Sequence, residues 1–261
     1  MERFIMGHDG SSSVFVFVDL DDSLFNSLRK CQPGVHLQAA ALLSNGEVVS
    51  YTSPAQRALI QWLHLGAHVI PVTARSMEGY ARVLVDFHGP AIVSFGAIIL
   101  NQQGQPDAQW QQRMALDLLA AKPLLQEACE SVLQHIAQEG IDAWAKVVEE
   151  LGQMQYLLLK HRSADAQALA RIADFCLKPW AAHRPGWRVF QNDNNLTLLP
   201  PALDKAHAVE YLMNMLRAEH GHIVTVGMGD SLSDSGFLSL CDYAMAPKGT
   251  QLAQRLLIGG A

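Results

Sequence analysis

A short apolar run near the amino terminus, which ends in carboxylates, limits the possible folds of this chain most strongly. Residues 14–18 read VFVFV, and such a run of β-branched and aromatic residues is typical of a strand buried on both faces in a parallel sheet. Asp19, Asp21 and Asp22 follow at once, with Ser23 beside them. Because ligands bind at the carboxyl ends of strands in open α/β sheets, these acids are predicted to stand at a functional site.

The spacing of the first two acids indicates a cation. Asp19 and Asp21 lie two residues apart, so both side chains point to one side of an extended chain. Neighbouring anions cost free energy unless a cation or a shared proton intervenes, and Mg²⁺ prefers oxygen ligands. Asp-rich strand ends are also common as turns and helix caps. The motif alone leaves both interpretations open.

Composition and length exclude several classes of protein. The chain has 261 residues, enough for one large domain or two modest ones, and its net charge of −6 argues against a nucleic-acid surface. No apolar run approaches the roughly 20 residues that span a membrane, and the first 13 residues contain no signal-peptide pattern. The four cysteines lack any paired CxxC spacing. We expect a soluble cytoplasmic protein with reduced thiols and without nucleic-acid or membrane partners.

Strand and helix patterns alternate in the outer parts of the chain, which predicts an α/β fold with a doubly wound, mostly parallel sheet. Asn45-Gly46 indicates a hairpin within residues 25–53, and Pro54 begins a helix after a Ser cap. Strands are predicted over residues 68–72 and 91–95. The hairpin leaves directly from the acidic strand end, so it could either cover the site or be an ordinary surface hairpin.

The middle of the chain has a different pattern. A long amphipathic helix over residues 114–138 is followed by two strands, a helix and two more strands. This α-β-β-α-β-β order predicts a separate α+β domain at residues 108–190, inserted into a sheet domain made of residues 1–107 and 191–261.

Polar residues recur at four predicted strand ends or helix starts, and each has an ordinary explanation as a cap, a turn or a solvated charge. They are Asp19 with Asp21, Thr73, Lys205, and Asp230 with Asp234. Together they suit phosphoryl transfer. A carboxylate can attack phosphorus, a second acid can protonate the leaving oxygen, and donors and cations hold the phosphoryl oxygens. A magnesium ion would offset the charge of the nucleophile.

This set of motifs resembles the haloacid dehalogenase superfamily, in its Cof-like and sucrose-phosphatase-like branch. The DxDx(T/S) motif stands at residues 19–23, and the second motif is a strand that ends at Thr73. Lys205 is the third motif, and residues 229–234 read GDSLSD as the fourth. Residues 108–190 occupy the place of a C2B-type cap in this family.

The resemblance implies a role for each catalytic position. Asp19 would be the nucleophile and a magnesium ligand. Asp21 would be the general acid and base, and would also bind the metal through its backbone carbonyl. Thr73 and Lys205 would hold the phosphoryl oxygens. The predicted fold is thus a Rossmann-like core with an inserted cap.

The resemblance also implies a Mg²⁺ site, for which Asp230 and Asp234 join Asp19 and Asp21. Residue type and position make several further side chains candidate substrate contacts, although an ordinary surface charge is the alternative for each of those in the inserted domain. The candidates are Ser23, Arg75, Lys160, His161, Arg162, His183 and Arg184.

The predicted function is a magnesium-dependent phosphatase that hydrolyses a small phosphorylated metabolite through an aspartyl-phosphate on Asp19. Resemblance alone favours a sugar phosphate. Two alternatives stay open. A phosphomutase would use the same intermediate and return the phosphoryl group to its substrate. A non-catalytic phospho-switch, similar to receiver domains, would also combine acids, a Thr and a Lys, but would need no inserted domain.

Overall fold

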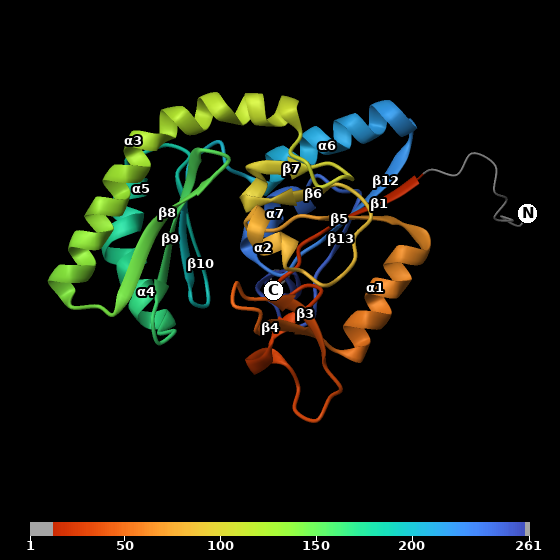
Figure 1. Ribbon diagram of the computed structural model, residues 1–261, viewed down its shortest axis with the longest axis horizontal. Coiled ribbons are helices and arrows are strands. Elements are labelled where there is room, and N and C mark those ends of the chain that lie inside the picture. Colours follow the sequence, from red (N-terminus) through yellow and green to blue (C-terminus); the bar gives the residue numbers. More distant parts are fainter. Residues whose placement is uncertain (1–12, 259–261) are drawn as a thin grey trace, which may run out of the picture.

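The computed structural model describes residues 13–258 of the chain. The expectation that the first residues form no signal peptide therefore lies outside the described residues. Figure 1 shows two bodies, one built around a parallel sheet and the other made of antiparallel strands covered by helices.

The parallel sheet contains four strands in the order β13-β12-β1-β5. These are β1 (Ser13–Val18), β5 (His68–Pro71), β12 (Ile223–Met228) and β13 (Tyr243–Met245). Val18 pairs with both Met228 and Pro71, so the segments that follow β1, β12 and β5 leave the sheet at one edge. This register brings separated sequence motifs to the same place.

Helices cover both faces of this sheet, as the apolar run of β1 predicts. The elements are α1 (Pro54–Gly66), α2 (Met77–Ala81), α6 (Lys205–His220), α7 (Ser235–Leu238) and α8 (Gln251–Ile258), with the strand pair β6 (Ala91–Val93) and β7 (Ile98–Leu100). Phe17 belongs to the buried cluster that includes Leu212 of α6. Val18, one residue on, belongs to the cluster that includes Leu63 of α1.

The predicted hairpin is present and forms part of a small sheet in the order β2-β4-β3. Its strands are β2 (Asn26–Ser27), β3 (Gln38–Leu42) and β4 (Val48–Thr52), and a 3₁₀ helix at Leu28–Lys30 follows β2. Gly46 adopts a φ of 85°, the left-handed conformation that the turn requires.

The second body has the predicted α-β-β-α-β-β order, with a sheet in the order β10-β11-β9-β8. Its elements are α3 (Ala108–Glu139), β8 (Ala143–Glu150), β9 (Gln153–His161), α4 (Ala166–Ile172), a π-helical turn (Ala173–Leu177), α5 (Lys178–Ala182), β10 (Arg188–Asn192) and β11 (Asn195–Leu199). Helix α3 begins six residues before the predicted start, because the Asp107 side chain accepts a hydrogen bond from the Trp110 N–H and caps the helix there.

The boundary predicted at residue 190 falls inside β10. Strand β11 pairs with β9 of the same antiparallel sheet, so we propose that the inserted unit continues to Leu199. Within residues 13–258, no helix has the length and apolarity needed to cross a membrane. All four cysteines are free thiols.

Candidate active site

A buried lysine joins two of the predicted acids. Lys205 opens α6, whose start is capped by the Asp204 side chain through the Ala206 N–H. Lys205 Nζ lies 2.6 Å from Asp19 Oδ1 and 2.7 Å from Asp234 Oδ1. Burial alone would lower the pKa of Lys205, but the two carboxylates raise it, so the ammonium group stays charged.

Both oxygens of Asp234 are engaged, one by the loop after β12 and the other by Lys205. Asp234 Oδ2 accepts hydrogen bonds from the Asp230 N–H at 3.2 Å, the Ser231 N–H at 3.0 Å and the Ser231 hydroxyl at 3.0 Å. Oδ1 is bound to Lys205. Because both oxygens are engaged, Asp234 is better suited to position this loop and the lysine than to bind a metal directly.

The glycine before this loop has a packing reason. A Cβ atom on Gly229 would lie 2.6 Å from the Cβ and 2.9 Å from the Oδ2 of Asp234. Any larger residue would therefore displace Asp234, and with it the hydrogen bonds that hold Asp230.

Three carboxylates lie close together beside the Lys205 ammonium group. One oxygen each of Asp19, Asp230 and Asp234 lies within 4.8 Å of the other two, and all three residues are buried. Burial raises the pKa of Asp19 well above its usual range, although Lys205 opposes the shift. Burial, followed by the charge of Asp234, raises the pKa of Asp230 to about 7. A divalent cation would balance the excess negative charge, and an all-oxygen donor set fits Mg²⁺.

Thr73 stands beside Asp19, because the Val72 N–H donates to the Val18 carbonyl at 2.8 Å across the edge of the sheet. The Thr73 side chain is buried, and its Oγ1 accepts a hydrogen bond from the Arg75 N–H at 3.1 Å. The hydroxyl hydrogen remains available for a further acceptor. Thr73 can thus donate to an oxygen of a group bound at Asp19.

Arg75, expected to contact a substrate, is engaged by Asp21. Its Nε and Nη2 each lie 2.7 Å from a different oxygen of the Asp21 carboxylate. Nη2 also lies 3.3 Å from Ser50 Oγ on β4, and the guanidinium stands 5.3 Å from the Phe25 ring centroid. The hairpin therefore contacts the site through Ser50, and the Arg75 fork orients Asp21 outside the buried acidic cluster.

Strand register turns one lysine of the second body toward this site. Leu157 and Leu159 on β9 belong to the buried cluster under α3 and α4, so Lys160 points from the opposite face. Burial lowers the pKa of Lys160, as does the neighbouring Lys146, whereas the charge of Asp21 raises it. Lys160 therefore lies on the face of β9 that is turned away from α3 and α4, within reach of the charge of Asp21.

The geometry does not support the expectation that His161 and Arg162 contact a substrate. His161 is buried on the helix-covered side of β9, with its Nδ1 3.1 Å from Ser163 Oγ. Arg162 Nη1 lies 2.8 Å from Asp142 Oδ1 in an exposed ion pair. The same alternation that turns Lys160 toward the site turns His161 away from it.

The last two candidates follow α5. Arg184 Nη2 lies 2.6 Å from Glu127 Oε1 on α3, and its guanidinium stands 3.9 Å over the Trp180 ring. Arg184 is thus explained by packing between helices. His183 ends α5.

The contacts between the two bodies could not be predicted from the sequence. Glu150 at the end of β8 accepts hydrogen bonds from the Met77 N–H at 2.8 Å and from the Ser94 hydroxyl. Arg29 forms an ion pair with Asp193 in the turn between β10 and β11. The partners are far apart in the chain, and local patterns cannot show such pairs.

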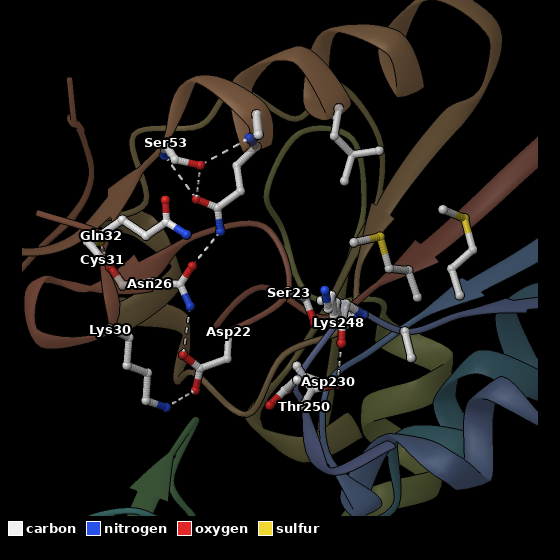
Figure 2. A pocket seen from close by; sticks show the side chains of 18 of the residues that line it. Asp22, Ser23, Asn26, Lys30, Cys31, Gln32, Ser53, Asp230, Lys248 and Thr250 are labelled. Carbon is white, nitrogen blue, oxygen red and sulfur yellow. Dashed lines mark hydrogen bonds and ion pairs between the residues drawn. The ribbon is translucent and has the colours of Figure 1, made fainter. Parts of the chain in front are cut away.

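A cavity of about 890 Å³ adjoins the acidic cluster (Figure 2). Its wall comes from the segment after Asp21, the start of α1 and the turn after β13, and it includes Asp230. Ser23, expected to contact a substrate, also lines it. Only 3% of Ser23 is exposed, and its Oγ has no hydrogen-bond partner among the described residues. Its hydroxyl can therefore hydrogen-bond to a ligand or a water molecule in the cavity.

Solved structures share this fold. An IMP-nucleotidase from Plasmodium falciparum, with IMP bound, matches with a TM-score of 0.59 and 13% identity over 95% of this chain and 67% of that chain. A sucrose-phosphatase from Synechocystis, in complex with sucrose and phosphate, matches with a TM-score of 0.52 and 15% identity over 95% and 97% of the two chains. The C-terminal domain of a trehalose-6-phosphate phosphatase from C. albicans matches with a TM-score of 0.53 and 14% identity over 87% of this chain and 73% of that chain.

No protein-family model and no curated protein matches the sequence. Because these solved structures share only 13–15% of their residues with this chain, the comparison shows the fold alone. The chain has the α/β fold of these phosphatases, and the fold class expected from the resemblance to the haloacid dehalogenase superfamily is confirmed.

Proposed function

We propose that this chain is a phosphatase that hydrolyses a small phosphomonoester, with Mg²⁺ as cofactor and a covalent phosphoryl intermediate on Asp19. The observation that carries the proposal is the buried arrangement in which Lys205 bridges Asp19 and Asp234, next to Asp230. An acid that only caps a helix, or a lysine that is only solvated, would not need to be buried in such a cluster. A site that binds phosphate oxygens next to a nucleophile needs a buried cation beside a carboxylate.

The first step transfers the phosphoryl group to the protein. Lys205 holds Asp19 Oδ1, which leaves Oδ2 to attack phosphorus. The bond between phosphorus and the leaving oxygen breaks, and that oxygen takes a proton from Asp21. Thr73 and Lys205 donate to the phosphoryl oxygens, where negative charge has to be held during the transfer.

The second step returns the site to its starting state. Asp21, now ionised, takes a proton from a water molecule as the water oxygen attacks phosphorus. The bond between phosphorus and Asp19 breaks, and inorganic phosphate leaves. Arg75 orients the ionised Asp21 carboxylate, which is the base of the second step, through its two 2.7 Å hydrogen bonds. In the first step, one of these hydrogen bonds has to open so that Asp21 can carry the proton that it donates.

Asp19 and Asp230 are the carboxylates that would hold Mg²⁺, with the Asp21 backbone carbonyl as a third ligand and Asp234 supporting the loop. When bound, the ion neutralises charge on the nucleophile and on the phosphoryl group. Burial is the first cause of the raised pKa of both Asp19 and Asp230, and a bound cation would oppose it by favouring the ionised carboxylates.

The solved structures that share the fold support a small phosphorylated metabolite as substrate. One is a sucrose-phosphatase with sucrose and phosphate, another is a trehalose-6-phosphate phosphatase, and the third is an IMP-nucleotidase with IMP. Two of the three names concern sugars, which supports a sugar phosphate.

The test is phosphate release from p-nitrophenyl phosphate and a panel of phosphorylated metabolites, with and without Mg²⁺. We expect turnover that requires Mg²⁺ and is lost in Asp19→Asn. Asp117→Asn, an exposed position on α3, is the matched control and should keep full activity. If wild type and Asp19→Asn are equally inert on every compound, the hydrolase assignment is wrong. Conversion of one sugar phosphate into its isomer without free phosphate would favour the phosphomutase.

A further inference from the structure

The position of Lys205 depends on the residue before it, because Asp204 caps α6 and Lys205 is the first residue of that helix. Asp204 Oδ1 accepts a hydrogen bond from the Ala206 N–H at 2.8 Å, and its backbone carbonyl accepts one from the His207 N–H at 3.1 Å. A Cβ atom on Gly96 would lie 2.5 Å from that carbonyl oxygen, so Gly96 packs directly against it. Any movement of Asp204 therefore moves the start of the helix that carries Lys205.

An arginine of the inserted unit engages the two residues that precede Lys205. Arg188 is the first residue of β10; its Nη1 donates to Asp204 Oδ2, and its Nη2 donates to the Leu203 carbonyl. The two oxygens of Asp204 are thus divided between the helix start and Arg188. Only 32% of the Arg188 side chain and 19% of the Asp204 side chain are exposed, so solvent screens this ion pair less than it screens a pair on the open surface.

The segment that joins the inserted unit to α6 is held at a second point. A Cβ atom on Gly186 would lie 2.8 Å from Cβ and 2.9 Å from Cγ of Pro201, so the turn before β10 packs against this segment. Arg188 itself is fixed by strand pairing, in which it stands opposite Leu199 of β11. The start of β10 therefore lies along the connecting residues 201–204, and close packing of this kind transmits displacements from one element to the other.

The connection between Arg188 and the proposed reaction centre runs through the start of α6. No hydrogen bond among the described residues joins Arg188 to the acidic cluster, and the cavity wall that these residues form does not include it. Lys205 Nζ lies 2.6 Å from Asp19 Oδ1 and 2.7 Å from Asp234 Oδ1, and such short contacts leave little room for a displaced helix start. An effect of Arg188 on the reaction therefore has to be an effect on the place of Lys205.

We propose that Arg188 is a positioning residue, which sets through Asp204 where Lys205 Nζ stands between Asp19 and Asp234. The inference rests on the proposed function, because it takes Lys205 to hold an oxygen of the phosphoryl group. A displacement of about 1 Å at a reaction centre can cost about 100-fold in rate. The inserted unit thereby takes a part in the chemistry that does not depend on the leaving group, since every phosphomonoester carries the same phosphoryl group.

The test breaks the link from either end. Arg188→Gln removes the charged fork, and Asp204→Asn removes the charge that it binds but still caps α6, because Asn is as good a cap as Asp. We expect kcat/KM to fall about tenfold or more in each variant, by the same factor for p-nitrophenyl phosphate and glucose 6-phosphate. The double variant should fall no further than the more impaired single variant, because both changes break one link. Arg171→Gln, which removes an exposed arginine of α4, is the matched control and should keep full activity.

A role that only stabilises the fold would not give this pattern. It would lower Tm and leave the inhibition constant of inorganic phosphate unchanged, whereas a displaced Lys205 should raise that constant about tenfold. Both are measured at a temperature at which the Tm shows each variant to be folded. Arg188→Lys keeps the charge without the fork and should recover part of the loss, and it takes the place of Arg188→Gln if that variant does not fold.

The outcomes separate this inference from the proposed function. A loss confined to glucose 6-phosphate, an unchanged inhibition constant of inorganic phosphate, or additive losses in the double variant would each overturn the positioning role while the phosphatase stands. If the wild type hydrolyses no compound, the proposed function fails, and calorimetric binding of inorganic phosphate decides the inference. Binding about tenfold weaker in both Arg188→Gln and Asp204→Asn than in the wild type would support it. Equal binding in all three proteins, or none in the wild type, would end it.

Discussion

The acidic cluster and the cavity beside it are built in opposite ways. In the cluster, Lys205, Asp19 and Asp234 are buried; Lys205 donates to both acids, and both oxygens of Asp234 accept hydrogen bonds. In the cavity, Gln32 is exposed and the hydrogen-bonding groups of the wall are only partly used. Burial makes the cluster rigid and intolerant of change, whereas the wall can change without loss of the fold. A site so arranged fixes its chemistry and leaves its specificity adjustable.

The largest effect is expected from breaking the cluster at its centre. Lys205→Met removes the cation between two buried carboxylates, and the unpaired charges should cost about 3–5 kcal/mol of the free energy of unfolding. Phosphatase activity should be lost. Urea denaturation and phosphate release measure the two effects. A variant as stable as wild type would mean that the cluster is not the rigid unit described here.

Gly229→Ala tests the same rigidity through packing alone. The added methyl group would lie 2.6 Å from Asp234 Cβ, and overpacking of this kind costs about 1–3 kcal/mol. Activity should fall because Asp234 positions Lys205. Gly152→Ala, where no atom lies within 4 Å of the added group, controls for the loss of glycine, although its φ of 73° adds local strain. Activity at the wild-type level in Gly229→Ala would show that Asp234 can shift freely.

The contrast between the two regions also explains what the sequence could predict. The apolar run before Asp19 and the alternation of strands and helices predicted the fold. The gathering of Asp19, Lys205 and Asp230 was predicted from the ends of the strands and from the order of motifs that the chain shares with a known family, although Asp19 and Lys205 are 186 residues apart. The pairing of Arg75 with Asp21 joins side chains 54 residues apart, and no local pattern shows it. The choice of Lys160 over His161 depends on strand register, which residue type does not reveal.

Magnesium should stabilise the cluster in a manner that depends on pH. Asp230 has a pKa of about 7 in the folded chain, against about 4 when unfolded, so without metal its contribution to stability is lost as pH rises from about 4 to 7. The ion needs the ionised carboxylate. Mg²⁺ should raise the free energy of unfolding by about 1–3 kcal/mol near saturation, and the accompanying rise in Tm should therefore be larger at pH 8 than at pH 6. Asp230→Asn should abolish this difference between the two pH values. An equal rise in Tm at pH 6 and pH 8 in the wild type would contradict the prediction.

Arg75→Lys tests the link between the cluster and the more open side of the site. Lysine keeps the charge but cannot form the two parallel hydrogen bonds to Asp21. We expect kcat to fall about tenfold, with KM for p-nitrophenyl phosphate nearly unchanged, because the proton transfer and not binding is impaired. A rise in KM at constant kcat would instead make Arg75 a substrate contact, as residue type alone suggests.

The smallest effects are expected in the second body. Lys160 lies on β9 and Arg162 directly after it, so substituting each tests whether strand register or residue type decides which cation faces the site. Lys160→Met should raise KM for sugar phosphates a few-fold, because this lysine lies within reach of the charge of Asp21. Arg162→Met removes an exposed ion pair with Asp142, which is worth at most about 1 kcal/mol, and should leave turnover within twofold of wild type. Steady-state kinetics on glucose 6-phosphate distinguishes the two. If Arg162→Met had the larger effect, the second body would have to approach the site by a different face, and the inward direction of Lys160 would not describe the working enzyme.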